Sequence, residues 1–397
     1  MKQNTFRLYF IDVMRAFAIT MMLQGHFVDS LLAPEFRDES NIIFSTWKYF
    51  RGITAPTFFT VAGFIFMYLL IKDTVNVGWN NPRVRKGIKR GLTLIGLGYL
   101  LRLNITGLFV GKVYAGFYMV DVLHCIGISI LLLISIYLYS YQRKSFVMPS
   151  LLLGSTLLLF LFAPIYGASN FEMLPVALAN YFTKAYGSVF TIIPWFGYAA
   201  FGAFMAVFFN KYKEFKYIYH YAIGITFVLG IALLWFSSPF FLEVYRLTGI
   251  ELASQIYSNN YLFMRLGNVM IWFTLFMLLR NVITSKAIRT IGQNTLSIYV
   301  IHFMLLYGSF SGIGLYKFFK LSLNPYVIVP GALMFVIATV YLSFRYNEYK
   351  PMVTEKLELV KQELQIFFLE TYQVVYLILQ KLKEKIIALL AFVRSGS

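Results

Sequence analysis

Residues 119–141 read MVDVLHCIGISILLLISIYLYSY, an apolar run long enough to cross a lipid bilayer. Similar runs recur along the 397-residue chain, which is 59% hydrophobic and only 13% charged, whereas soluble proteins average roughly 25% charged residues. A backbone in lipid must satisfy its own hydrogen bonds, so the choice lies between helices and a closed barrel. Because the runs are continuous and do not alternate polar with apolar residues, the sequence predicts membrane helices.

By the same criterion of length and hydrophobicity, we expect an all-α polytopic bundle of about ten transmembrane helices. The predicted spans are residues 8–29, 54–72, 88–109, 119–141, 146–165, 189–210, 218–240, 260–280, 291–311 and 325–344. The first run carries Asp12 and Arg15 and lacks a small-residue cleavage site, so we interpret it as a retained span and not as a signal peptide.

The segments between these runs alternate in charge. One set is basic and contains Lys2, Arg7, Lys72, Arg83, Arg85, Lys86, Lys89, Arg90, Arg143, Lys144, Lys211, Lys213, Lys216, Arg280, Lys286, Arg289 and Arg345. The other set has fewer bases and carries the acidic residues Asp29, Glu35, Asp38, Glu39, Asp121, Glu172, Glu243 and Glu251. Since lysine and arginine mark cytoplasmic segments, ten spans with both termini in the cytoplasm fit every segment.

Several other classes of function are disfavoured. The net charge is +18, but the bases lie between membrane runs and not on a soluble module, so we expect no nucleic-acid partner. The single cysteine, Cys125, excludes a disulfide framework and a cysteine-built metal site. With four histidines and no acidic cluster between them, we expect no metal. No phosphate-binding loop, dinucleotide fingerprint or Gly-x-Ser-x-Gly turn is present.

Ionisable residues at membrane depth cost about 2.5–3.5 kcal/mol each and are functional candidates by default. The first helix carries Asp12, Arg15 and His26. Asp12 and Arg15 are three residues apart and share a face, so a structural ion pair is the alternative to a catalytic role. His26 projects from nearly the same stripe about three turns later. It is either a general base or acyl carrier, or a hydrogen-bonded histidine at a helix end.

Two further histidines lie in the outer halves of predicted spans. Asp121 and His124 are three residues apart, so the carboxylate could orient the imidazole as a general base needs, and a purely structural role for the pair is the alternative. His302 follows Asn294 and Tyr299 on the ninth span, where a helix–helix hydrogen bond is the alternative. Three further ionisable residues have structural interpretations. Arg102 and Arg265 can extend to water at outer helix ends, and His220 lies at the inner interface.

The basic cluster of residues 83–90 and the C-terminal segment each leave two interpretations open. The cluster contains Arg83, Arg85, Lys86, Lys89 and Arg90. It is either a topology signal that meets anionic lipid or a binding site for a phosphorylated ligand. Residues 346–397 form a predicted amphipathic helical tail, separate from a membrane domain of residues 1–345; a membrane-surface helix and a helix-pairing segment are both open. Its apolar stripe is Val353, Leu357, Val360, Leu364 and Phe367.

Six short segments, in this order along the chain, resemble the transmembrane acyltransferases that include heparan-alpha-glucosaminide N-acetyltransferase and the bacterial acyltransferase-3 proteins. The segments are residues 11–19 (IDVMRAFAI), 50–58 (FRGITAPTF) with Gly63, 89–92 (KRGL), 121–127 (DVLHCIG), 194–198 (PWFGY) and 291–302 (IGQNTLSIYVIH). The likeness covers roughly residues 7–345. Ala16 replaces the usual glycine of the first motif.

The resemblance implies an enzyme that takes an acyl group, here acetyl, from cytoplasmic acyl-CoA and passes it to a sugar on the far side of the membrane. We expect a bacterial cytoplasmic membrane protein, with N- or O-acylation and homo-oligomerisation left open. The expected catalytic residues are His26, Asp12, Arg15, Asp121, His124 and His302. The basic cluster of residues 83–90 is expected to bind CoA, and Arg51, Asn294 and Tyr299 to bind substrate.

Two other functions remain alternatives. The first is a transporter or lipid flippase that uses Asp12, Arg15 and His26 as its coupling site. The second is a non-catalytic membrane scaffold. A tunnel that begins beside Arg85 and Lys89 and reaches His26 would favour the acyltransferase.

Overall fold

The computed structural model describes residues 8–73 and 75–395, so the predicted cytoplasmic bases Lys2 and Arg7 lie outside the described residues. Within these ranges the chain is helical, and its extended pairings are two isolated bridges, Leu32 with Leu323 and Asn104 with Phe310. The predicted all-α class is confirmed. The chain divides into two compact units, Met1–Val340 and Tyr341–Ser397.

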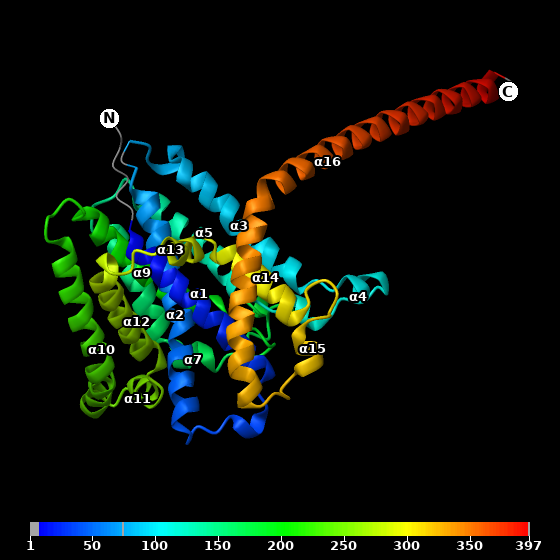
Figure 1. Ribbon diagram of the computed structural model, residues 1–397. Coiled ribbons are helices and arrows are strands. Elements are labelled where there is room, and N and C mark those ends of the chain that lie inside the picture. The colour runs from blue at the N-terminus through cyan, green and yellow to red at the C-terminus, as the bar shows by residue number, and fades with distance from the viewer. Residues whose placement is uncertain (1–7, 74, 396–397) are drawn as a thin grey trace. The chain divides into compact units, whose positions relative to one another are not determined.

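The longer helices follow the predicted spans in chain order (Figure 1). The α-helices of eight residues or more are α1 (Tyr9–Leu31), α2 (Ile42–Ile71), α3 (Pro82–Arg102), α5 (Val122–Ser140), α6 (Val147–Leu161), α9 (Ile192–Lys211), α10 (Ile218–Thr248), α11 (Glu251–Ser258), α12 (Tyr261–Leu278), α13 (Lys286–Gln293), α14 (Thr295–Tyr307) and α16 (Pro325–Ser395). Shorter α-helical elements are α4 (Ile105–Phe109), α7 (Ala163–Gly167), α8 (Val176–Ala179) and α15 (Leu315–Phe319), and the 3-10 turns are η1 (Pro34–Phe36), η2 (Gly78–Asn80), η3 (Ala115–Tyr118) and η4 (Leu279–Asn281).

Six helical segments in the described residues are long and apolar enough to cross a membrane. They are Ile42–Ile71, Gly116–Ser140, Ile192–Lys211, Ile218–Thr248, Tyr261–Asn281 and Pro325–Met352. The predicted spans at α6 and α14 are apolar but only 15 and 13 residues long, and those at α1 and α3 carry charged side chains. In Figure 1, α10 lies at the edge of the bundle beside α12, and its Trp235 and Phe236 are exposed, as expected of side chains that face lipid.

Two predicted spans begin too late in the sequence, because asparagine caps start the helices earlier. The helix predicted at 54–72 begins at Ile42, where the Asn41 side chain accepts hydrogen bonds from the backbone N–H groups of Ile43 and Phe44. The helix predicted at 88–109 begins at Pro82, after the cap Asn81, and ends at Arg102. The basic cluster of residues 83–90 therefore lies on the first turns of a helix and not in a loop.

Other spans differ from the prediction at their ends. The helix predicted at 291–311 is divided at Asn294 into α13 and α14, and α14 ends at Gly308, whose φ of 70° is left-handed. The helix predicted at 218–240 continues to Thr248 and also ends at a left-handed glycine, Gly249. The last predicted span continues to Ser395 as α16. Of the apolar stripe predicted for its tail, the side chains of Val353 and Leu357 are not among those that the structure describes.

The helices of the first unit pack closely through small residues, which allow membrane helices to approach without side chains between them. At the α2–α9 contact, a Cβ added to Gly202 would lie 1.8 Å from the Thr60 carbonyl oxygen. A Cβ on Gly63 would lie 1.9 Å from the carbonyl oxygen of Ala199. Any side chain larger than hydrogen would separate these two helices at either position.

We expect Gly202→Ala to destabilise the protein, because its methyl group would force the α2 and α9 backbones apart. Overpacking of this kind typically costs about 1–3 kcal/mol. Gly224→Ala in α10 is the matched control, since a Cβ there meets nothing within 4 Å. Thermal unfolding in detergent should show a lower midpoint for Gly202→Ala alone. An unchanged midpoint would contradict the close packing described here.

Candidate active site

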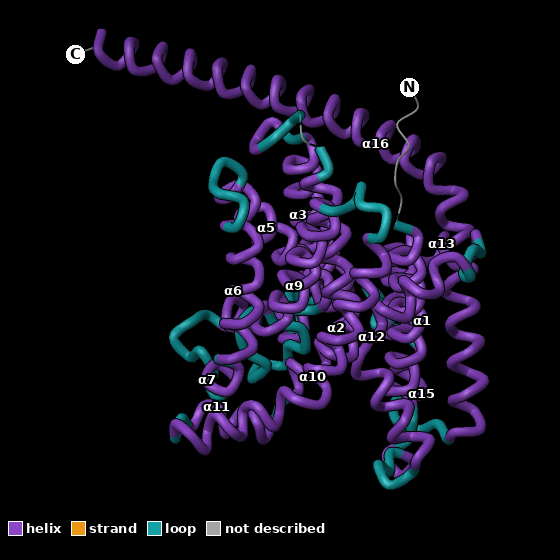
Figure 2. The backbone as a smooth tube through the Cα atoms, turned by 90° about the vertical axis from the view of Figure 1, so that its left-hand side faces the viewer, coloured by secondary structure: helices purple, strands orange, loops and turns teal. Residues whose placement is uncertain are grey.

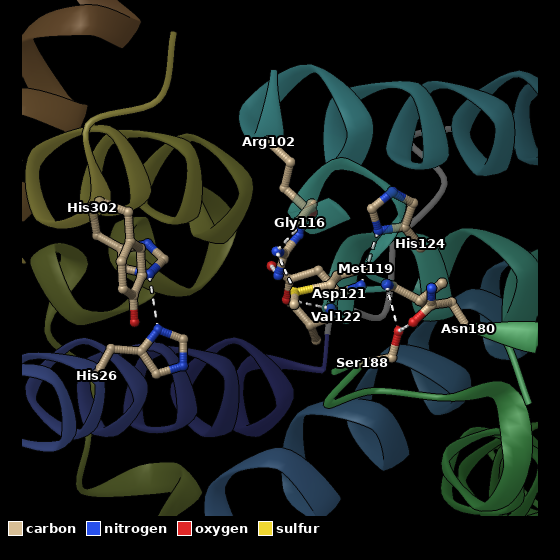
Figure 3. Close-up of polar contacts among 12 residues, drawn as sticks. His26, Arg102, Gly116, Met119, Asp121, Val122, His124, Asn180, Ser188 and His302 are labelled. Carbon is tan, nitrogen blue, oxygen red and sulfur yellow. Dashed lines mark hydrogen bonds and ion pairs between the residues drawn. The ribbon is translucent and has the colours of Figure 1, made fainter. Parts of the chain in front are cut away.

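Two histidines from distant parts of the chain meet in the interior. His26 on α1 and His302 on α14 point toward each other, with Nδ1 of the first 3.1 Å from Nε2 of the second (Figure 3). His302 is completely buried, whereas His26 lines two cavities. The sequence predicted both as site residues, and the structure brings them into direct contact.

The two cavities beside His26 also share Arg51. The smaller has a volume of about 240 Å³, and the larger, of about 700 Å³, is additionally lined by Asp29, Arg102 and Asp121. Arg51 forms an ion pair with Asp29, which holds its guanidinium on the α1 side of α2. The predicted substrate-binding residue Arg51 and the predicted catalytic residues His26 and Asp121 therefore border one space.

Asp121 pairs with Arg102, not with the His124 imidazole. Its carboxylate lies 3.0 Å from the Arg102 guanidinium and also accepts the backbone N–H of Val122 at 2.6 Å (Figure 3). The expectation that Arg102 extends to water was wrong, because the carboxylate of Asp121, the residue that caps the start of α5, neutralises it. This pair joins the end of α3 to the start of α5.

His124 is held by backbone and aromatic contacts. Its Nδ1 accepts the backbone N–H of Asp121 at 3.0 Å, and its fully buried ring packs on Tyr99, with 4.3 Å between centroids. The Tyr99 hydroxyl lies 2.6 Å from that of Tyr181, and burial, aided by this bond, raises the pKa of Tyr181. Asp121 thus orients the imidazole through its backbone and not its carboxylate, and His124 is absent from the walls of the two cavities beside His26.

A third cavity, of about 220 Å³, is lined by one face of the basic cluster on α3. Arg83, Lys86 and Arg90 follow one another at steps of three and four residues, and all three line this cavity. Arg85 and Lys89 lie on the other side of the helix and are not among its lining residues. The predicted CoA-binding cluster is therefore divided into a cavity-facing set and an outward-facing set.

Arg15 lines the same cavity and is fixed by neighbours from two helices. It lies 3.9 Å from Asp12, so the predicted ion pair is present, and it donates to the Thr295 hydroxyl at 2.9 Å. Gln293 donates to Asp12 at 3.3 Å. A Cβ on Gly292 would lie 1.8 Å from the Asp12 carbonyl oxygen, so α13 approaches α1 directly at this pair.

The basic cavity and the cavities beside His26 are separate but adjacent. Phe58 lines both the 220 Å³ cavity and the 240 Å³ cavity. Tyr299 lines the basic cavity, and its ring lies 4.8 Å from that of His302. The described residues therefore form two adjacent spaces, not one continuous tunnel from the basic cluster to His26, and Phe58 lies where the two spaces meet.

Sequence reasoning gave no site role to several wall residues, among them Arg102, Thr295 and Phe58, and included one residue that lies elsewhere. Phe58 and Thr295 lie within segments that carry the family resemblance, which is the one signal that could have found them. Asn294 was expected to bind substrate, yet it lies at the junction of α13 and α14 and is not among the lining residues of these cavities. In the described residues, no three His, Cys, Asp or Glu side chains form a group that could hold a metal.

Comparison with known proteins supports the resemblance. No curated protein matches the chain. Residues 7–236, more than half of the chain, match the family described as "Heparan-alpha-glucosaminide N-acetyltransferase, catalytic". The matched range includes His26, Arg51, the basic cluster and Asp121, whereas His302 lies beyond it. The chain therefore belongs to the heparan-alpha-glucosaminide N-acetyltransferase catalytic family, and it is an acetyltransferase-type membrane enzyme.

Proposed function

We propose that this enzyme transfers an acetyl group from acetyl-CoA on the cytoplasmic side to a sugar on the extracytoplasmic side of a bacterial cytoplasmic membrane. The family to which it belongs uses acetyl-CoA as donor. The observation that carries the proposal is that His26, in contact with His302, lines two cavities, one of which meets the basic cavity at Phe58. Residues 1–345 are the proposed catalytic domain, and residues 346–397 its cytoplasmic tail.

The proposed topology has ten spans and cytoplasmic termini. Contacts between helix ends support it, because they join residues predicted to share a face of the membrane. On the predicted cytoplasmic face, the Arg289 guanidinium lies 4.7 Å from the Tyr9 ring and the Arg280 guanidinium 4.4 Å from the Tyr219 ring. On the opposite face, the backbone N–H of Ala33 donates to Leu323 at 2.9 Å.

In this scheme the basic cavity binds CoA. Arg83, Lys86 and Arg90 would pair with the phosphates, as arginine and lysine commonly do. Behind them the walls are mainly apolar, including Leu94 and Ile130, and suit the pantetheine arm. The thioester would then lie near Tyr299 and Phe58, and movement of the Phe58 side chain would open the way to His26.

The histidine pair supports a general-base mechanism. A hydrogen bond between two imidazole nitrogens needs one N–H and one lone pair. If His26 Nδ1 carries the proton and His302 Nε2 accepts, the other His26 nitrogen, Nε2, is free to accept a proton. The acceptor amine or hydroxyl would attack the thioester carbonyl while losing its proton to His26. The carbon–sulfur bond then breaks, and the departing thiolate takes that proton to give free CoA.

The transporter alternative is less well supported. A coupling site formed by Asp12, Arg15 and His26 would place these residues in one space. Instead, Arg15 lines the basic cavity and His26 lines the cavities beyond Phe58. The division of charges between two separate spaces suits two substrates better than one transported ion.

We expect His26→Gln to lower kcat by about 10²–10⁴-fold, because the acceptor would lose the group that takes its proton. His220→Gln is the control, since this exposed histidine begins α10 away from the cavities. Both purified variants are assayed with radiolabelled acetyl-CoA and glucosamine, with size-exclusion profiles as a check on folding. Full turnover by a well-folded His26→Gln protein would remove His26 from the mechanism.

The two sides of the basic cluster provide a matched comparison for CoA binding. The triple variant Arg83→Gln, Lys86→Gln and Arg90→Gln should weaken CoA binding by at least about tenfold, since it removes all three α3 bases from the cavity. The double variant Arg85→Gln and Lys89→Gln should bind almost normally. Calorimetry in detergent measures both affinities. If the two variants changed the affinity for CoA equally, the basic cluster would be better explained as a topology signal.

A further inference from the structure

A large cavity lies on the predicted extracytoplasmic side, apart from His26. Its volume is about 700 Å³, and its walls come from α7, residues 182–185, the start of α9 and the junction of α11 with α12. Helices α7 and α11, which both contribute to its walls, lie side by side (Figure 2). None of the residues proposed for catalysis lines this space, so the mechanism leaves it without a role.

Amides are the most numerous polar side chains that line this cavity. Asn170, Gln255, Asn259 and Asn260 all line it, and among the lining residues that the structure describes there is no acidic side chain and a single basic one, Lys184. Each amide offers both a donor and an acceptor, which is the pattern that hydroxyl groups require. Carboxylates, sulfates and phosphates are instead bound by arginine clusters or several lysines.

Two buried wall residues carry polar atoms that lack a partner in the described part of the chain. They are Asn260 Oδ1, an acceptor, and Trp195 Nε1, a donor, and both residues are only 6% exposed. The Asn260 Nδ2 group donates to Ser237 at 2.6 Å and Ser238 at 2.9 Å, so this amide is fixed with its oxygen as the free end. These two atoms are themselves almost inaccessible, so the contacts to a ligand would come from the exposed amides of Gln255 and Asn259.

The amide-lined cavity adjoins the smaller cavity that contains His26. Lys184, Trp195 and Tyr261 line both spaces. A single molecule that passes these three side chains can therefore have one end beside His26 and the other among the amides. Trp195 and Tyr261 also supply the apolar ring faces against which sugar rings can pack.

We propose that the amide-lined cavity is a binding site for a neutral, hydroxyl-rich sugar ring attached to the sugar that is acetylated. This inference rests on the proposed function and adds to it an acceptor class: an oligosaccharide whose second ring is uncharged. An anionic second ring would lose its hydration and meet amides and Lys184 alone, so it would gain little from this site.

The test compares three acceptors for the full-length protein: glucosamine, glucosaminyl-glucose, and the same disaccharide with glucuronic acid in place of glucose. We expect kcat/KM for the neutral disaccharide to exceed that for glucosamine by about tenfold, from a few added hydrogen bonds. The double variant Gln255→Ala and Asn259→Ala should lose this gain and retain its rate with glucosamine. The side chains of Gln255 and Asn259 are exposed. Gln142→Ala is the control, because this exposed glutamine follows the C-terminal end of α5 and does not line the cavity.

Equal rates with glucosamine and the neutral disaccharide would overturn the proposal, as would an equal gain from the anionic disaccharide. If none of the three acceptors is acetylated, the proposed function fails, and binding decides the site separately. Tryptophan fluorescence of the unreacted protein is then titrated with glucosaminyl-glucose. A saturable change that Trp195→Phe and the double variant abolish supports the site, and the absence of any change overturns it.

Discussion

Polar side chains buried among membrane helices must find partners within the protein, and this constraint determines how the site is built. His26 contacts His302, Arg102 pairs with Asp121, and Arg15 contacts both Asp12 and Thr295. Most of these contacts join different helices: α1 to α14, and α3 to α5. Removing one partner leaves the other buried and unpaired, so the same residues that position the chemistry also hold the bundle in register.

The pairs are arranged along α1, which gives the site two ends. Arg15 and Thr295 lie beside the basic cavity, while His26 and His302 lie two turns further along α14. Because both contacts join α1 to α14, the two helices run in the same direction past each other. One helix pair therefore spans the distance from the proposed CoA site to the proposed acceptor site, with Phe58 between the cavities.

The sequence predicted the helical class and singled out several residues that line the cavities, among them Arg15, His26 and Arg51, because long apolar runs and charges within them are local signals. It also predicted the Asp12–Arg15 pair, since three-residue spacing places both side chains on one helical face. It could not pair Arg102 with Asp121 or His26 with His302, because these contacts depend on how helices pack. The early starts of α2 and α3 were missed, although Asn41 and Asn81 are recognisable caps in retrospect.

In the proposed mechanism an acetyl group crosses the membrane while CoA does not. Proteoliposomes of known orientation test it directly, with radiolabelled acetyl-CoA only on the side that bears Lys86 and glucosamine only on the opposite side. We expect acetylated glucosamine in the second compartment, with CoA retained in the first, and loss of product in His26→Gln vesicles. Product that forms only when both substrates share one compartment would contradict it.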